Sequence, residues 1–487
     1  MKNGEYNLCS RTLAPPSASL GGLGRREFLY RFGSGLGSVA LTSLLAEEGL
    51  GAVTTGGLPP DPLAPKPAHH APKAKACIFL FMSGAPSQMD TFDPKPALDR
   101  YHGKPITRIY GSLEKRLYVG CPFKFARHGE SGMEISEIFP NIAECADDLA
   151  VVRSLHTSDE AHTTATFFMN TGAPIPGSPS VGSWVTYGLG SMNNNLPSFV
   201  VLPDKREGVF GGSINWSNGF LPADYQGTLF RSEGVPIVDI QPPDGVTRRR
   251  QRDNLDLLDD LNRPYVGSNP RNGALLSRMR NYEQAFRMQT AVPEALDLDK
   301  ESPQTRELYG IDQKVSEHMG RKCLMARRLV ERGVRFIQIY CAGWDSHENI
   351  ALHHRRRGYE TDKPIAGLLK DLKRRGLLDE TLVVWGGEFG RTADNSMLFF
   401  RTNPGRDHNK EAMVMWMAGG GVKGGTVIGE TDELGIKAAE DVYHTHDLHA
   451  TILHQMGLND RRLVYYHAGR MKRLTDLGGR VIHEALA

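Results

Sequence analysis

The chain has 487 residues, of which 40% are hydrophobic and 23% charged, and both values are ordinary for a globular protein. This length can hold two or three domains, or one large α/β domain with insertions, and it is enough to bury a sizeable core. The formal net charge of +2 favours neither nucleic acid nor an anionic membrane as a partner. The dense basic run at 248–252 precedes an acidic, leucine-spaced stretch, which indicates a solvated helix; a phosphate- or polymer-binding patch is the alternative.

The N-terminal region carries a targeting pattern. Arg25 and Arg26, followed by Phe28 and Leu29, precede a short apolar stretch rich in Gly, Ser and Ala. This order predicts a signal peptide over 1–46, and the paired arginines predict the twin-arginine (Tat) export machinery as a partner. We therefore expect a periplasmic or extracellular protein. We expect no stable membrane span, because about 15 apolar residues are too few to cross a bilayer; an ordinary amphipathic N-terminal helix is the alternative.

Residues 47–75 predict a linker, because they are rich in Pro and Ala and lack apolar periodicity. From residue 76 to 487, short apolar runs alternate with helical patterns, which predicts an α/β domain with a mostly parallel sheet covered on both faces. The predicted strands are 76–82, 149–152, 334–340, 381–385 and 412–418, and the predicted helices are 313–332, one that ends at Gly376, and 448–456 with Asp447 as its cap. The polar stretch near 204–310 breaks this rhythm and predicts an insertion over one end of the sheet.

Acidic residues, histidines and glycines lie next to several predicted strands. Because sites in open parallel sheets form beyond the carboxyl ends of the strands, we expect these loops to meet in one cleft. Carboxylate oxygens and imidazole nitrogens together are ligands for a divalent ion such as zinc, manganese or calcium. The candidate metal ligands are Asp90, Asp345, His347, Asp407 and His408, and the candidate catalytic residues are His162 and Glu388.

Each of these motifs also has a structural interpretation. Asp345 and His347 would then be a hydrogen-bonded loop pair, and Glu388 would hold Arg391 in a tight turn. The histidines at 444, 446 and 449 cluster near a predicted helix start, where one of them could join the site or all could have cap and surface roles. The joint placement of the motifs at strand ends favours the metal site.

Several tracts, taken in order, resemble the family called domain of unknown function 1501. They are FMSGAPSQMDTFDPKP from residue 81, GWDSHEN from 343, VVWGGEFGRT from 383, GRDHN from 405 with MAGGGVKGG from 417, and HDLHATILHQMGL from 446. That family is abundant in exported, twin-arginine-tagged bacterial proteins and is related to the alkaline phosphatase and sulfatase superfamily. The resemblance spans about 76–475 and implies a three-layer αβα sandwich with a mostly parallel central sheet, an alkaline phosphatase-like core.

The chain departs from the superfamily pattern at the second metal site. Where the superfamily has a metal-binding Asp after the first strand, this chain has Ser83. His162 stands at the place of the nucleophile, and Glu388-Phe389-Gly390 replaces Asp-His-Gly. Since Phe389 cannot bind a metal, the resemblance implies an altered second site.

The first metal site of the superfamily is better matched. Asp345, His347 and His408 correspond to its Asp, His and His, although the gap between the first two is shorter here. The resemblance therefore implies one well-kept ion, or a rearranged pair.

Two classes of function remain. The first is an exported, metal-dependent hydrolase of sulfate or phosphate esters, with a small-molecule or polysaccharide ester as substrate. A divalent ion would polarise the ester oxygen and lower the pKa of a bound water, and His162 or Glu388 would act as general base. The rivals for His162 are Thr163 or Thr164 as nucleophile, and a helix cap. The second class is a non-catalytic exported binding or scaffold protein that keeps the fold and a structural metal.

Replacing both Arg25 and Arg26 by Lys should leave the precursor in the cytoplasm, because the pair is an address read by a receptor. The fold should survive, since the pair has no packing role. Cell fractionation of the double variant measures this, and unchanged export would remove the argument for the twin-arginine route.

Overall fold

A computed structural model of the chain describes residues 60–106, 116–268, 273–395 and 403–487. The segment predicted as a signal peptide, 1–46, and the first part of the predicted linker lie outside the described residues. Pro60–Ala487 forms one compact unit. Within it the rest of the predicted linker packs on the domain: the Lys66 ammonium donates to the Tyr187 carbonyl at 2.7 Å, and Ala74 is buried.

A nine-stranded sheet forms the centre of this unit, in the order β12-β4-β11-β8-β1-β7-β5-β6, with β15 paired to β4. The strands are β1 (Ala76–Met82), β4 (Leu149–His156), β5 (Phe199–Leu202), β6 (Thr228–Leu229), β7 (Phe336–Cys341), β8 (Thr381–Gly386), β11 (Met413–Ala418), β12 (Thr426–Ile428) and β15 (Tyr443–His444). All neighbouring pairs are parallel except those of β11, which runs antiparallel to β4 and β8. The mostly parallel sheet predicted from the sequence is confirmed.

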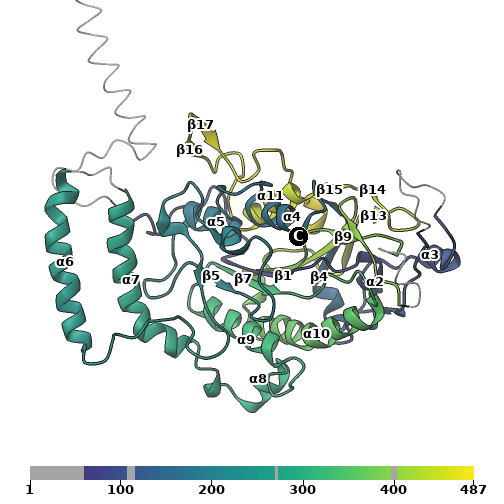
Figure 1. Ribbon diagram of the computed structural model, residues 1–487, viewed down its shortest axis with the longest axis horizontal. Helices are drawn as coiled ribbons and strands as arrows, with labels where there is room; N and C mark the ends of the chain where they lie inside the picture. Colours follow the sequence, from purple (N-terminus) through teal and green to yellow (C-terminus); the bar gives the residue numbers. More distant parts are fainter. Residues whose placement is uncertain (1–59, 107–115, 269–272, 396–402) are drawn as a thin grey trace, which may run out of the picture. The chain divides into compact units, whose positions relative to one another are not determined.

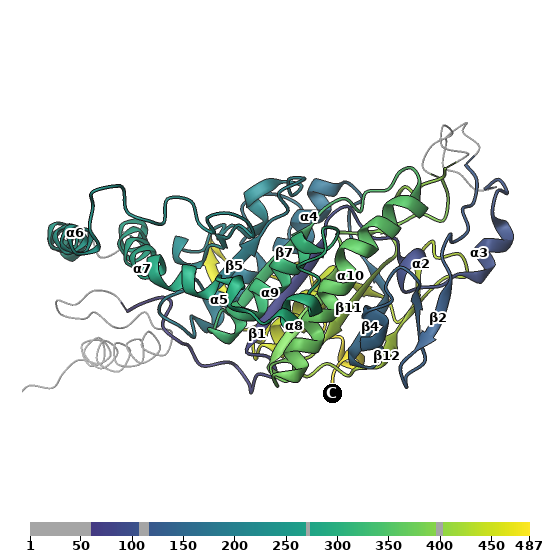
Figure 2. The ribbon, with the colours of Figure 1, turned by 90° about the horizontal axis from the view of Figure 1, so that it is seen from below.

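Helices cover both faces of the sheet. Figures 1 and 2 show α9 (Glu317–Glu331) and α10 (Ile350–Arg374) on one face, and α4 (His162–Thr171), α5 (Val181–Leu189) and α11 (Thr445–Gln455) on the other. The side chains of β1 alternate between the two resulting cores, with Leu80 on the α9–α10 side and Phe79 on the other. Because both faces are buried, the strand is apolar at every position. The three-layer αβα class is therefore confirmed.

The antiparallel strand β11 brings one further loop to the carboxyl edge of the sheet. β1, β4, β7 and β8 all end at this edge, whereas β11 begins there. The loop 405–409, which precedes β11, therefore lies among loops that follow the parallel strands. A short antiparallel ladder between β9 (Gly390–Arg391) and β10 (His408–Asn409) ties this loop to the one after β8.

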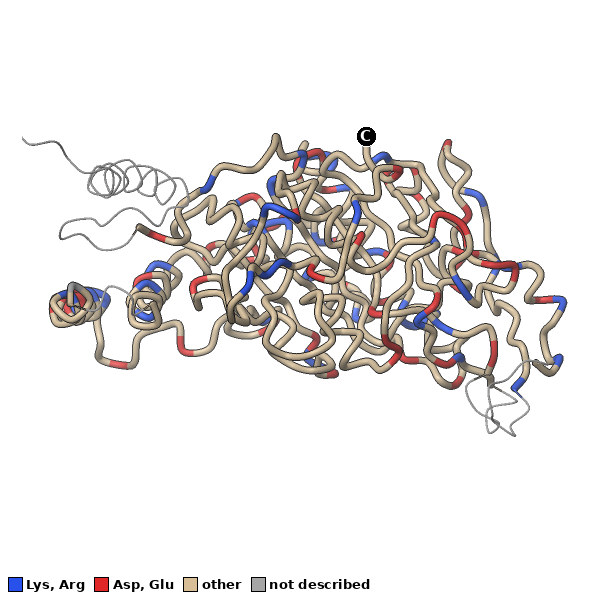
Figure 3. Tube along the Cα trace, turned by 90° about the horizontal axis from the view of Figure 1, so that it is seen from above, with Lys and Arg blue, Asp and Glu red and all other residues tan. Residues whose placement is uncertain are grey.

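The stretch near 204–310 contains two long helices, α6 (Arg248–Ser268) and α7 (Gly273–Ala295), that pack against each other. The basic run opens α6, and Arg252 forms ion pairs with Asp256 and Glu283. Acidic and basic positions are interspersed along this pair and the rest of the described chain (Figure 3). Shorter elements are α2 (Gln88–Thr91), α3 (Pro96–Tyr101), α8 (Pro303–Leu308), and the hairpins β2–β3 (Phe125–His128, Met133–Ser136), β13–β14 (Glu430–Thr431, Ala438–Glu440) and β16–β17 (Tyr465–His467, Arg470–Lys472).

None of the helices in the described part of the chain combines the length and the apolar character that crossing a membrane requires.

A histidine caps helix α11. His444 is the N-cap, its Nδ1 accepts the His446 N–H, and the Asp447 carboxylate accepts the His444 N–H at 2.7 Å. Asp447, predicted as the cap, thus takes the N3 position of a capping box. One turn on, His449 Nε2 lies 2.7 Å from the Met169 carbonyl of α4. Because a carbonyl only accepts, His449 donates from Nε2 and joins the two helices.

Acid should destabilise the protein through His446 and His449. Burial lowers the pKa of His446 from 6.5 to about 4 and that of His449 to about 3. Between about pH 6.5 and 4 the unfolded chain therefore binds more protons than the folded one, so the free energy of unfolding falls as the pH falls through this window. We expect a lower midpoint of thermal unfolding at about pH 5 than at about pH 7.5.

Other groups titrate in the same range, so the comparison between variants is decisive. His449→Gln keeps a donor near the Nε2 position for the Met169 carbonyl and removes the titration, and it should reduce the difference between the two midpoints. An undiminished difference in this variant would contradict the assignment.

Candidate metal centre

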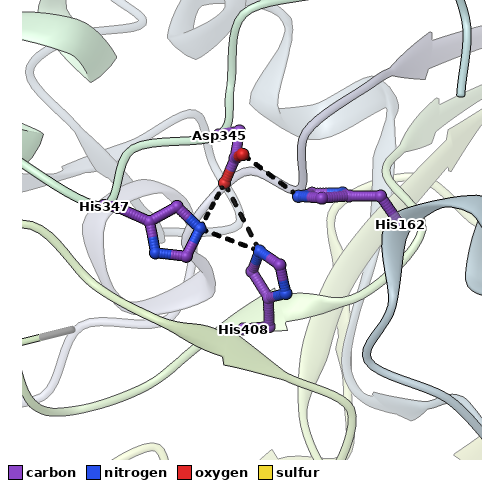
Figure 4. A group of neighbouring side chains, drawn as sticks. All are labelled: His162, Asp345, His347 and His408. Carbon is purple, nitrogen blue, oxygen red and sulfur yellow. Dashed lines mark hydrogen bonds and ion pairs between the residues drawn. The ribbon is translucent and has the colours of Figure 1, made fainter.

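Four side chains from three segments meet at the carboxyl edge of the sheet (Figure 4). His162 is the first residue of α4, Asp345 and His347 lie in the loop after β7, and His408 begins β10 ahead of β11. One ring nitrogen from each histidine and one carboxylate oxygen all lie within 4.8 Å of one another. We call these four residues the metal cluster, since imidazole nitrogens with a carboxylate are a ligand set for zinc.

The spacing of the donor atoms fits one divalent ion. Asp345 Oδ1 lies 2.9 Å from His347 Nε2 and 3.5 Å from His408 Nε2, and Asp345 Oδ2 lies 3.3 Å from His162 Nε2. His347 Nε2 and His408 Nε2 are 2.9 Å apart. A tetrahedral zinc ion with ligands at about 2.0–2.2 Å separates those ligands by roughly 3.3–3.6 Å. The observed spacings lie close to this range.

The second ring nitrogen of each histidine in the cluster faces an oxygen atom. The distances are 2.6 Å from His162 Nδ1 to Glu388 Oε1, 2.8 Å from His408 Nδ1 to the Glu160 carbonyl, and 3.6 Å from His347 Nδ1 to Asp407 Oδ1. Oxygen acceptors in these places favour protonated Nδ1 atoms, so that the Nε2 atoms, which face the other donors of the cluster, carry the lone pairs that an ion would use. Histidines that bind metals are commonly held in this way.

The charges of the cluster favour a cation. Burial opposes a charge on His162, but hydrogen bonds with Asp345 and Glu388 outweigh it and raise the pKa of His162 to about 9. Burial likewise opposes ionisation of Asp345. Hydrogen bonds from the three histidines outweigh that burial, together with the charge of Arg391, and hold the pKa of the Asp345 carboxyl well below its usual range. The site therefore keeps an ionised carboxylate and attracts positive charge, from protons or from a metal ion.

A buried arginine fixes the loop that carries Asp345. Arg391 Nη2 donates to Asp345 Oδ1 at 2.6 Å and also to the Gly84 carbonyl, and Arg391 Nε donates to the Ala85 carbonyl at 3.1 Å. Gly84 has φ of +103°, and a Cβ atom there would lie 2.4 Å from the Asp345 main-chain nitrogen. Glycine is therefore required at this turn, because the loop after β7 packs directly on it.

The structure places Asp90 outside the metal cluster. Its carboxylate oxygens accept from Arg406 Nε at 2.6 Å and Arg406 Nη2 at 3.0 Å, and both side chains are fully buried. These bonds use the oxygens that a metal would need. The prediction of Asp90 as a ligand is therefore replaced by a structural ion pair.

Asp407 and Glu388 contact histidines of the metal cluster without belonging to it. Asp407 accepts the His408 main-chain N–H at 2.9 Å and pairs with Arg116 at 3.1 Å. Glu388 is fully buried, and its Oε1 accepts the Gly84 N–H at 2.9 Å in addition to facing His162. Both carboxylates therefore contact histidines of the metal cluster, whereas the sequence predicted Asp407 as a metal ligand and Glu388 as a catalytic residue.

Aromatic rings pack against two histidines of the metal cluster. The Phe389 ring centroid lies 4.8 Å from that of His162 and 4.7 Å from that of His408. Phe210 stacks on His162 at 4.3 Å with an interplanar angle of 8°. The sequence did not predict Phe210, because it lies in the stretch predicted as an insertion, eight residues after β5, a strand that was not among those predicted. Ser83, at the other altered position, is buried.

The histidines near the start of α11 form a separate group. His444 and His446 pack edge-on against Phe168, and His449 contacts the α4 main chain. None of them belongs to the metal cluster. Their roles are a helix cap and contacts between helices.

The family model described as "Protein of unknown function (DUF1501)" matches residues 74–486, and the chain therefore belongs to this family. No curated protein matches the sequence. Similar solved structures include the PsFucS1 sulfatase from Pseudoalteromonas sp., at 14% identity over 79% of this chain and 68% of that chain, with a TM-score of 0.36. Another is the alkaline phosphatase from the Antarctic bacterium TAB5, at 10% identity over 80% and 99%, with a TM-score of 0.34. A third is the lipoteichoic acid synthase LtaP from Listeria monocytogenes, at 8% identity over 82% and 76%, with a TM-score of 0.35.

Replacing His408 by Ala should weaken zinc binding by about 100-fold or more, because it removes a ligand. The zinc-loaded variant should also unfold at a lower temperature, since an ion that binds only the folded state stabilises it. Elemental analysis and thermal unfolding of the purified chain measure the two effects. His483→Ala, at an exposed histidine outside the cluster, is the control. Wild-type protein that binds no divalent ion would exclude the site.

Proposed function

We propose that this protein is an exported, metal-dependent hydrolase of sulfate or phosphate esters that uses one divalent ion. The proposal rests on one observation. Three histidines, each with an oxygen atom facing its Nδ1, lie together with one carboxylate at the carboxyl edge of the sheet. The side chains of Asp345, His347 and His408 are 34%, 32% and 22% exposed, so a molecule in solution can reach them. The paired arginines at 25 and 26 support export.

Zinc suits this donor set best among the ions expected from the sequence. Imidazole nitrogens are common zinc ligands, whereas calcium takes six to eight oxygen ligands, and His162, His347 and His408 do not supply them. When bound, such an ion supplies a Lewis acid that polarises a sulfuryl or phosphoryl oxygen. The four residues of the cluster would hold it.

His162 is better placed as a ligand than as a covalent nucleophile. Its Nδ1 faces Glu388 at 2.6 Å and its Nε2 faces Asp345 at 3.3 Å, and its ring is stacked on Phe210. An imidazole engaged on both nitrogens and clamped on its face is not free to attack a substrate. We infer that water attacks the ester directly, without a covalent enzyme intermediate. The rival nucleophile is Thr163, the next residue of α4.

Glu388 supports His162 in this proposal. It is fully buried, so it does not meet a substrate that enters from the exposed side of the cluster. Its contact with Nδ1 instead sets the tautomer and orientation of the His162 ring. Glu388 is therefore a positioning residue, and the general-base role considered from the sequence does not suit its location.

A non-catalytic binding or scaffold protein is the second candidate, and one observation favours it. Four protein ligands can complete a tetrahedral shell, and closed shells of this kind are typical of structural zinc sites. The exposure of the cluster argues for the hydrolase. A zinc-loaded wild-type chain that hydrolyses no sulfate or phosphate ester would favour the scaffold.

A panel of sulfate and phosphate esters, including sulfated polysaccharides, tests the hydrolase with the zinc-loaded full chain. His162→Gln should lower hydrolysis by about 100-fold or more, and Glu388→Gln, which keeps the shape and removes the charge, by about 10–100-fold. Thr163→Ala should change the rate by less than about 10-fold, because in this proposal Thr163 neither binds the ion nor attacks the ester. The loss of a general base or a ligand would cost more than that.

Mass spectrometry of the wild type during turnover supplies the opposing outcome. A phosphoryl- or sulfo-threonine at Thr163, together with loss of activity in Thr163→Ala, would overturn the direct attack by water.

A further inference from the structure

We infer that Asp345 is an exchangeable ligand: Arg391 holds its carboxylate, so that three histidines retain the ion and the fourth position opens for the oxyanion of the substrate. This inference rests on the proposed function. It accounts for how a cluster with four protein ligands can catalyse a reaction, since catalytic zinc sites commonly have three protein ligands and one open position.

Arg391 needs the Asp345 carboxylate as its counter-charge. Its guanidinium is fully buried, and its partners among the described residues are the Asp345 carboxylate and the carbonyl groups of Gly84, Ala85 and Arg406. A buried guanidinium that loses its counter-charge is strongly destabilising. The pair between Arg391 and Asp345 is therefore expected to persist when an ion binds.

The guanidinium binds the carboxylate oxygen that two of the histidines face, while the other oxygen, Oδ2, faces His162 Nε2 at 3.3 Å. Asp345 Oδ1 faces His347 Nε2 at 2.9 Å and His408 Nε2 at 3.5 Å, and the same oxygen accepts from Arg391 Nη2 at 2.6 Å. A charge-assisted hydrogen bond of this kind draws electron density from the carboxylate. Asp345 is consequently a weaker donor toward the ion than an unpaired carboxylate.

The groups around the histidines have the opposite effect on donor strength. The Glu388 carboxylate and the Glu160 carbonyl accept at Nδ1 of His162 and His408. Acceptors at this nitrogen raise the basicity of the ring and strengthen its bond to a metal. The surroundings of the cluster therefore strengthen the imidazole ligands and weaken the carboxylate ligand.

Exposure points to the same position. The side chains of Asp345 and His347 are 34% and 32% exposed, whereas that of His162 is 11% exposed and covered by Phe210 and Phe389, so the open side of the cluster is the one that includes Asp345. A substrate oxyanion that approaches from this side would face the ion, whose charge would stabilise the negative charge that develops in the transition state.

Zinc affinity of the full chain, measured by competition with a chromophoric chelator, tests the order of the ligands. His408→Ala should lose about 100-fold or more in affinity, and Asp345→Asn less than about 10-fold, because the carboxylate is already engaged. Arg391→Gln should bind zinc about 10-fold more tightly, since the carboxylate charge becomes fully available. The same variant should hydrolyse esters more slowly.

Arg327→Gln is the matched control, because it also removes a buried arginine from carboxylate pairs, those with Glu301 and Asp371, away from the cluster. It should lower thermal stability and leave zinc affinity within about 3-fold of the wild type. Arg391→Lys retains the charge and should bind zinc less tightly than Arg391→Gln does. If Arg391→Gln does not fold, as judged by near-ultraviolet circular dichroism, Asp345→Asn decides, because asparagine keeps the shape and an oxygen acceptor for Arg391 Nη2.

Two results would overturn the inference while the metal site stands: a loss in Asp345→Asn as large as in His408→Ala, or weaker zinc binding in folded Arg391→Gln. A wild-type chain that binds no zinc would instead overturn the proposed function itself. The two failures are therefore distinguishable.

Discussion

The buried guanidinium of Arg391 joins the loops from which the site is built. It donates to the turn after β1 through Gly84 and Ala85, to the loop after β7 through Asp345, and to the loop ahead of β11 through the Arg406 carbonyl. Because no solvent reaches it, each of these bonds has to be made within the protein. A shift of any one loop would leave a buried donor unsatisfied, so the loops hold one another in place.

A second buried arginine, Arg406, allows the pair of Arg391 and Asp345 to be compared with a fully buried pair. Arg406 pairs with Asp90, and neither side chain is exposed, whereas Arg391 is buried and Asp345 is 34% exposed. The closed pair makes the surrounding loops rigid, because its two carboxylate oxygens have no access to any other partner. The open pair has the same chemistry, but its carboxylate keeps an exposed face that an ion or solvent can reach while the guanidinium stays bound. Burial of the acid, more than the type of residue, is what distinguishes the two pairs.

The sheet could be predicted from the sequence because its strands are apolar at every position, which is a local property. The convergence of Asp345 and His347 also followed from a general rule, since both lie just after a parallel strand. His408 precedes its strand, and its place in the cluster depends on β11 running antiparallel. Strand direction is set by pairing across the sheet, and the sequence of β11 alone does not contain it.

The fate of Asp90 illustrates the limit of this reasoning. Its position shortly after β1 resembles that of a ligand, but its partner Arg406 lies 316 residues away along the chain. No pattern in the sequence near Asp90 predicts that pairing. Phe210 was missed for the same reason: it comes from the insertion, and only the folded chain brings its ring onto His162.

Two aromatic rings limit the side from which a molecule can reach the metal cluster. Phe210 and Phe389 cover the side of the cluster where His162 lies, and their rings offer no lone pairs to a cation. A second ion on that side would lose its water without gaining ligands, which is unfavourable. The open side is the one that Asp345 occupies, next to the charge of Arg391. The proposed single ion and its direction of approach agree with the placement of these two phenylalanines, and the stretch that supplies Phe210 would then be part of the site.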